Sequence, residues 1–228
     1  MRRVVVTGLG IVSPIGNTVK EFWNSLLAGT CGIGPITRYD ASREEVRVAA
    51  EVKDFDPAQY FDVGERRRTE RYVQYAVAAA MQAAADAGIA GEVSPQRLGV
   101  YFGSGIGGAS AFLQGAKTLL ERGSSRVSPY FIPMVISNMA AGAIAIRTGA
   151  KGPCLPVVTA CATSSHAIGE AFRAIGHGYA DAILAGGAEA GIDPLIMAGF
   201  TNCGALSLQS DPNRACLPFD RRRDGFVM

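Results

Sequence analysis

Several residue patterns that would indicate common functions are missing from this chain of 228 residues. It has five cysteines but no CxxC pair and only two histidines, so the spacings typical of zinc ribbons, thioredoxin-like redox sites and His-rich metal sites are absent. No apolar run approaches the roughly 20 residues of a membrane helix, and no P-loop pattern occurs. The formal net charge of +2 offers no large basic field for a nucleic acid. We therefore expect a cytoplasmic protein that uses no metal and binds neither nucleic acid nor membrane.

Apolar runs and turn residues alternate along the chain in a way that predicts an α/β fold. Hydrophobic residues make up 48% of the chain and charged residues 18%, which is typical of a folded protein with a sizeable core. Strands are expected at residues 4–6, 98–102, 157–159 and 182–185. Helices are expected between them, at about residues 18–28, 69–87, 109–122, 136–147 and 162–175, with a proline-bounded loop at 129–133. Strands alternating with helices of this length indicate a largely parallel sheet covered by helices.

A glycine-rich loop follows the expected strand 98–102. Gly103, Gly105 and Gly108 fit the G-x-G-x-x-G pattern of dinucleotide-binding proteins. That pattern also needs an acidic residue at the end of a second strand about 20 residues later, and no strand is expected there. We therefore interpret these glycines as positions where backbone segments approach closely or leave room for a ligand beside Ile106.

Cys161 stands where an apolar strand is expected to lead into an amphipathic helix. The positive end of a helix and its free N–H groups favour an anion, so a thiol at this position is expected to be thiolate more often than an ordinary one. The same N–H groups can receive the oxyanion that forms when the sulfur attacks a carbonyl. Ala160 and Ala162 leave space beside the sulfur. The residues alone leave open whether Cys161 is a nucleophile or a buried thiol.

A resemblance to a known family rests on five separated segments: residues 3–10, 103–108, 159–163, 185–189 and 223–228. Together they resemble the condensing enzymes of the thiolase superfamily, and most specifically the β-ketoacyl-acyl-carrier-protein synthase II family. The resemblance implies a layered αβαβα fold of two related halves in a homodimer, of which residues 1–228 would supply mainly the first half. It also implies that Cys161 accepts an acyl chain from acyl-carrier protein, and that the acyl chain then condenses with malonyl-carrier protein after decarboxylation. No cofactor is implied.

The same resemblance assigns further residues to the site. Ile106 and Phe200 would line the acyl pocket, with Ile106 as a movable gate, and Phe131 and Ile132 would close the pocket of the neighbouring subunit. Acyl carrier proteins are acidic, so the basic run Arg66, Arg67 and Arg68 is expected to dock them, although a solvated helix start would also explain such a run.

Two other titratable residues receive no catalytic part. Glu189 could be read as a general acid, but the resemblance leaves it without a catalytic role. His166 is expected to be a packed or solvent-facing residue of the helix after Cys161, pointing away from the sulfur.

The family's second half carries two histidines and a lysine that assist decarboxylation and that this chain lacks. The chain alone is therefore expected to show little condensation activity. Two alternatives stay open: a non-catalytic ketosynthase fragment that acts as a folding or interaction module, or half of a polyketide-type ketosynthase.

Overall fold

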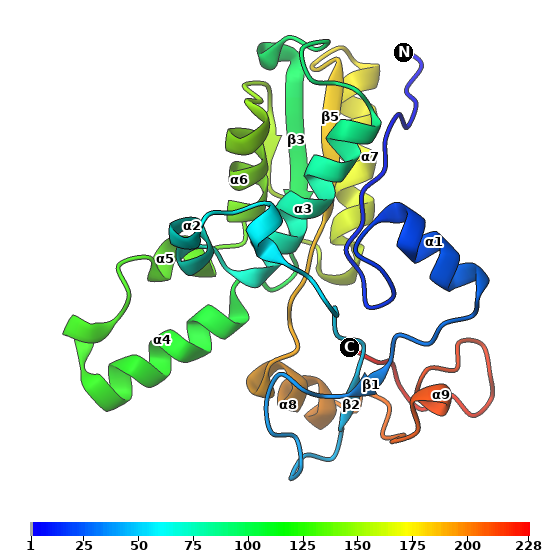
Figure 1. Ribbon diagram of the computed structural model, residues 1–228, viewed down its shortest axis with the longest axis vertical. Helices are drawn as coiled ribbons and strands as arrows, with labels where there is room; N and C mark the ends of the chain where they lie inside the picture. Colours follow the sequence, from blue (N-terminus) through cyan, green and yellow to red (C-terminus); the bar gives the residue numbers. More distant parts are fainter. Residues whose placement is uncertain (1) are drawn as a thin grey trace. The chain divides into compact units, whose positions relative to one another are not determined.

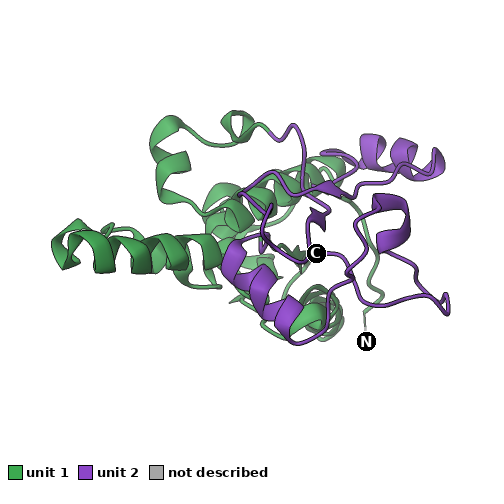
Figure 2. Ribbon diagram, turned by 90° about the horizontal axis from the view of Figure 1, so that it is seen from below, with its two compact units in different colours: residues 1–11, 56–190 green, residues 12–55, 191–228 purple. Residues whose placement is uncertain are grey.

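The computed structural model describes residues 2–228, which divide into two compact units (Figure 2). Unit 1 contains the residues up to 11 together with Asp56–Ala190, and unit 2 contains Val12–Phe55 and Gly191–Met228. Each unit therefore combines segments that are far apart in the sequence. Within the described residues, no helix is both long enough and apolar enough to cross a membrane.

Unit 1 is built on a three-stranded parallel sheet in the order β4-β3-β5. The central strand, β3 (Leu98–Gly103), is buried along its whole length, and it pairs with β4 (Cys154–Leu155) and β5 (Ala182–Gly187). Strands β3 and β5 run in register from Leu98 opposite Ala182 to Gly103 opposite Gly187. Their carboxyl ends therefore meet at one edge of the sheet, where the loops that follow both strands lie together.

Helices cover both faces of this sheet (Figure 1). Side chains alternate between the faces of a strand, and Val100 and Phe102 pack with α3 (Arg71–Asp86) and α6 (Met139–Thr148). Tyr101 points to the opposite face and packs against the alanines of α7 (Thr163–Gly176). The expected α/β architecture, with helices on both faces of a parallel sheet, is confirmed.

The remaining elements of unit 1 are short or lie outside these layers. They comprise η1 (Pro57–Gln59), α2 (Val63–Arg68), η2 (Pro95–Arg97), α4 (Ala109–Arg122), η3 (Ser124–Arg126), α5 (Phe131–Val135) and η4 (Ala160–Ala162). Helix α4 extends away from the sheet (Figure 1) and contains no buried residue.

Unit 2 has little regular structure. It contains α1 (Val19–Leu27), the antiparallel pair β1 (Gly34–Pro35) and β2 (Val48–Ala49), α8 (Pro194–Asn202) and α9 (Pro212–Ala215). Its core joins residues of the β1–β2 region, such as Ile36 and Ala49, to Met197 of α8 and Leu206.

Three expectations about local structure are wrong. Residues 4–6 form no strand, and Val5 and Val6 are exposed; the segment that follows lies along α3, where Leu9 N–H and Ile11 N–H donate to the side chains of Asp86 and Gln82. The expected strand at 157–159 is also absent, because the pairing with β3 is made earlier, by β4. The expected loop at 129–133 contains the start of α5, since a proline is tolerated in the first turn of a helix.

Candidate active site around Cys161

Cys161 lies in the 3₁₀ turn η4, directly before α7, and its side chain is exposed. The sequence predicts this position at the start of a helix. No side chain caps the N-terminus of α7; within the preceding 3₁₀ turn, Ala162 N–H donates to Thr159 O and Thr163 N–H donates to Ala160 O. The positive end of the helix dipole still favours an anion at this position. A reagent or substrate can therefore reach a sulfur that lies at the start of a helix.

The residue before the sulfur has an unusual backbone conformation. Ala160 has φ of +50°, in the left-handed region that residues with a Cβ rarely adopt. The buried Thr163 holds this conformation, because its hydroxyl accepts from Thr159 N–H at 2.9 Å and donates to Ala160 O at 2.8 Å. His166 supports the same turn through a 2.7 Å hydrogen bond between its Nδ1 and Thr159 Oγ1. The turn that presents Cys161 is thus fixed from the first two turns of α7.

Close backbone packing lies behind the glycines that the sequence singles out. A Cβ at Gly103 would overlap the carbonyl oxygen of Val157 and approach Thr163, and a Cβ at Gly187 would lie 2.5 Å from Ser164 Oγ. Both glycines therefore let the ends of β3 and β5 approach the segment that carries Cys161. The expectation that the first of these glycines permits close approach is confirmed.

The loop after β3 is organised by a carboxylate of the protein itself. Glu189 accepts hydrogen bonds from Gly105 N–H at 2.9 Å, Ile106 N–H at 3.1 Å and Ser104 Oγ at 3.0 Å. These are the N–H groups that a dinucleotide phosphate would need. The loop therefore binds an internal anion, in agreement with the rejection of the dinucleotide interpretation.

The carboxylate of Glu189 is partly withdrawn from water although the residue as a whole remains exposed. This desolvation raises the pKa of Glu189, and the hydrogen bonds from Ser104, Ile106 and Gly105 oppose the rise only in part. No ion pair involves Glu189 among residues 2–228, so the loop's own dipoles are what stabilise its charge.

The residues expected around an acyl pocket occupy different places. Ile106 lies in the glycine loop with 38% of its surface exposed, next to Gly105, where a Cβ would be 3.5 Å from Ala160. Phe131 and Ile132 are on α5; the ring of Phe131 packs against α4, 6.2 Å from the ring of Phe112, and Ile132 is exposed. The loop that carries Ile106 therefore approaches the Cys161 turn at Gly105, whereas Phe131 packs on α4.

Phe200 belongs to unit 2. It lies on α8, packs against the core of that unit, and makes an edge-to-face contact with Phe226 at 5.4 Å between ring centroids. This contact accounts for an aromatic residue at the position, and its expected acyl-pocket role stays a prediction.

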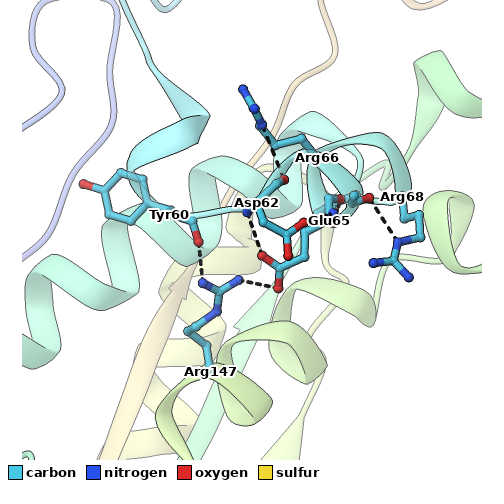
Figure 3. A network of polar contacts seen from close by, with 8 residues as sticks. Tyr60, Asp62, Glu65, Arg66, Arg68 and Arg147 are labelled. Carbon is cyan, nitrogen blue, oxygen red and sulfur yellow. Dashed lines mark hydrogen bonds and ion pairs between the residues drawn. The ribbon is translucent and has the colours of Figure 1, made fainter.

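The three arginines of the expected docking run form the last turn of α2. Arg66 donates to the carbonyl of Asp62 and Arg68 to that of Gly64, as Figure 3 shows, and the guanidinium of Arg68 also lies 5.6 Å from the Tyr130 ring centroid. Arg67 is exposed and makes no such contact within the described part of the chain. Cations at a helix C-terminus are favourable by themselves, which would account for three arginines here without a partner protein. Of the three, Arg67 makes the fewest contacts within unit 1.

Helix α2 is anchored to the helical layer by one arginine of α6. Arg147 donates to Tyr60 O and to Glu65 Oε1, the latter at 3.0 Å, and its guanidinium lies 4.9 Å from the Phe61 ring centroid (Figure 3). Asp62 and Glu65 form a capping box at the N-terminus of α2. The arginines therefore sit on a short helix with a defined position in unit 1.

Sequence reasoning missed the parts played by Glu189, Ser104, Thr163 and His166. A signal for the first existed: a glycine loop with free N–H groups and an acidic residue follow neighbouring parallel strands, at the same sheet edge. The contact spans 85 residues of sequence for Ser104 and Glu189, so it could be seen only once the strand order was known.

Comparison with known proteins identifies the family. A family model described as "Beta-ketoacyl synthase, N-terminal domain" matches residues 1–228. Curated proteins named 3-oxoacyl-[acyl-carrier-protein] synthase 2 are 51% identical in Synechocystis sp. and 48% identical in Coxiella burnetii; each match covers 100% of this chain and 55% of the relative. The chain therefore spans about half the length of the curated relatives it matches.

Solved structures agree with this result. A β-ketoacyl synthase from Burkholderia phymatum superposes with a TM-score of 0.88 at 33% identity, covering 100% of this chain and 56% of that one. The structure titled "AntDE:AntF (apo): type II PKS acyl-carrier protein in complex with its ketosynthase bound to the hexaketide" has a TM-score of 0.85 at 31% identity, covering 99% of this chain and 55% of that one. The expected thiolase-like fold is thereby confirmed, and the chain belongs to the β-ketoacyl synthase family, whose N-terminal domain it carries.

Proposed function

We propose that this chain supplies the acyl-accepting part of a β-ketoacyl-acyl-carrier-protein synthase in fatty-acid elongation, with Cys161 as the nucleophile. The observation that carries the proposal is the exposed thiol in a strained turn at an uncapped helix N-terminus. The names of the curated relatives support it.

The first half-reaction is a thioester exchange. The Cys161 thiolate attacks the carbonyl carbon of the acyl-carrier thioester, and the carbonyl electrons form an oxyanion to which the backbone N–H of Cys161 would donate one hydrogen bond. When the carbonyl re-forms, the bond to the carrier's sulfur breaks and that thiolate takes up a proton. The acyl chain is then held on Cys161 as a new thioester.

The second half-reaction joins this acyl group to a malonyl unit. Malonyl-carrier protein loses carbon dioxide, the resulting carbanion attacks the acyl carbonyl, and Cys161 leaves as thiolate with a β-ketoacyl-carrier protein as product. Neither histidine of this chain is placed for that step, because His166 bonds to Thr159 and His177 caps the C-terminus of α7. We infer that decarboxylation uses groups outside these 228 residues.

The proposal extends to partners and to the acyl pocket. An acyl carrier protein would dock on the basic end of α2, and Arg67 is free to meet its acidic surface. Ile106 and Phe200 would line the acyl pocket, and Phe131 and Ile132 would reach the pocket of a second copy in a homodimer. The expected setting is the cytoplasm.

Acylation of the full-length protein by acyl-carrier protein tests the proposal. Intact-protein mass spectrometry should show one acyl group per chain, and peptide mapping should place it on Cys161. Cys161→Ala should take up none, whereas Cys203→Ala, which removes another exposed thiol, should react as the wild type does. Acylation that persists in Cys161→Ala would refute the assignment.

Alkylation by iodoacetamide separates an active site from an inert fragment. All five cysteines are exposed, so access does not favour any of them. Faster labelling of Cys161 than of the other four thiols would support an activated nucleophile, and equal labelling would favour the non-catalytic interpretation. Chain extension on fatty acyl rather than polyketide substrates would separate the two pathway alternatives; the higher identity to the 3-oxoacyl synthases favours the first.

A further inference from the structure

We propose that Glu189 is a positioning residue that fixes the glycine loop, residues 104–107, and thereby determines which acyl chains reach Cys161. The inference rests on the proposed function, in which Ile106 of this loop lines the acyl pocket. It gives a role to a carboxylate that the condensation chemistry itself does not use.

The first step is the convergence of the loop on a single carboxylate. Oxygen Oε2 of Glu189 accepts from the N–H groups of Gly105 and Ile106, and Oε1 accepts from Ser104 Oγ. The hydroxyl of Ser104, a residue only 1% exposed, also accepts from Gly107 N–H at 2.9 Å. Four consecutive residues are thus tied, directly or through one hydroxyl, to Glu189.

The second step is that the parallel sheet holds the backbone of Glu189 in place. Gly187 is the last residue of β5 in register with β3, and Ala188 N–H donates to Gly103 O at 3.1 Å. Glu189 follows immediately, so its backbone is held by the same strand pair from which the loop begins. Glu189 therefore provides a fixed attachment point for the glycine loop, which contains no strand or helix.

The third step connects the loop to the nucleophile. A Cβ on Gly105 would lie 3.1 Å from Glu189 Oε2 and 3.5 Å from the Cα and the carbonyl oxygen of Ala160. Gly105 therefore lies close both to the carboxylate and to the residue that precedes Cys161. If the carboxylate were removed, the loop would lose its anchor on one side and the wall beside Cys161 would shift together with Ile106.

The fourth step concerns cost. A carboxylate that is partly desolvated and has no ion-pair partner in residues 2–228 is unfavourable for folding, because burial disfavours its charged form. Charge-assisted hydrogen bonds hold a loop more firmly than neutral ones. The carboxylate of Glu189 therefore lowers the stability of the fold but holds the glycine loop more rigidly than a neutral side chain would.

The test measures acyl transfer to Cys161 in the full-length protein as a function of chain length. Acyl-carrier proteins bearing chains from four to about sixteen carbons are offered to the wild type, Glu189→Ala, Glu189→Gln and Ser104→Ala, and kcat and KM are determined for each. Glu92→Gln, which alters an exposed glutamate elsewhere in unit 1, serves as the matched control.

We expect Glu189→Ala to change the ratio of long-chain to short-chain kcat/KM by about tenfold, since it removes three hydrogen bonds to the loop. Ser104→Ala should change the ratio in the same direction, and it carries the test if Glu189→Ala does not fold. The Gln variant should recover most of the wild-type profile, because its amide oxygen can still accept from Gly105 and Ile106. Glu92→Gln should match the wild type.

Three outcomes would overturn different parts of the argument. Wild-type protein that takes up no acyl chain would overturn the proposed function. Wild-type protein that is acylated, with identical chain-length profiles in all variants, would overturn only the role of Glu189. Uniform loss of kcat at every length, without rescue by Gln, would also contradict it, since that result indicates general damage to the fold.

Discussion

Nδ1 of His166 lies 2.7 Å from Oγ1 of Thr159, so a residue in the first turns of α7 supports the turn that precedes Cys161. The imidazole tautomer determines which of the two atoms donates. Together with the bonds of Thr163 to Thr159 and Ala160, this contact closes the turn from the side of the helix.

We expect His166→Ala to slow acylation of Cys161 about fivefold while leaving the helical content unchanged, because one hydrogen bond of about 1 kcal/mol is lost from the turn. Thr159→Val should have a similar effect. If the contact is the cause, the double variant should be little worse than either single variant, as a double-mutant cycle measures. Fully additive losses would show that the two side chains act independently.

The strands and helices that the sequence predicts best are those with a strong local signal in their pattern of residues. Strands β3 and β5 and helices α3, α4 and α7 lie close to their expected positions, because continuous apolar runs and helical spacing are local signals. Residues 4–6 read equally well as a strand, but a strand exists only if another strand pairs with it. The sequence contains no local information on that pairing.

The site divides in the same way. The position of Cys161 follows from its neighbours in the sequence, whereas the loop anchored by Glu189 depends on two segments that meet only after the parallel sheet has formed. The segment around Phe131 shows a further limit of sequence-based prediction. Pro133 suggested a loop, although this proline lies in the first turn of α5.

Gly103 should tolerate no side chain. Gly103→Ala would force a methyl group into the carbonyl of Val157 and against Thr163, and we expect the free energy of unfolding to fall by about 3 kcal/mol. Gly142→Ala is the matched control, since no atom lies within 4 Å of the added methyl group and the position is inside α6. That variant should be more stable by ~0.5–1 kcal/mol. Urea denaturation measures both, and equal stability of the two variants would contradict the packing argument.

Reversal of charge at Arg67 tests carrier docking with the least structural damage. Arg67→Glu should raise the KM for acyl-carrier protein about three- to tenfold, leave kcat unchanged and reduce the salt dependence of KM. Arg43→Glu, at an exposed position in unit 2, should leave KM unchanged. Arg68 is a poorer choice, because its side chain also bonds to Gly64 O and packs on Tyr130. The same KM in both reversal variants would place the docking surface elsewhere.

Asp181 should give the protein a measurable acid dependence. Hydrogen bonds from Arg97 and then from Arg2 lower the pKa of Asp181 from its ordinary 3.8 to about 2. A carboxyl whose pKa is lowered in the folded state contributes stability above its unfolded value, and this contribution is lost as the pH falls from about 4 to about 2. The difference in unfolding free energy between wild type and Asp181→Asn should therefore shrink across that window.

Arg97→Lys provides the comparison for this acid dependence. Lysine keeps the positive charge but loses the two-pronged contact with Asp181, so the pKa of Asp181 should be lowered less. The pH range over which Asp181 loses its stabilising effect should therefore become narrower. A wild-type–Asp181→Asn difference that stays constant from pH 5 to pH 2 would contradict the assignment.

The left-handed conformation of Ala160 limits how this position can vary, although its methyl group carries out no chemistry. Glycine would release about 1 kcal/mol of strain, but it would also let the peptide beside the sulfur rotate. Valine, isoleucine or threonine should destabilise the turn, because branching at Cβ is strongly disfavoured at a positive φ. Natural variants of the protein should accordingly lack β-branched side chains at this position.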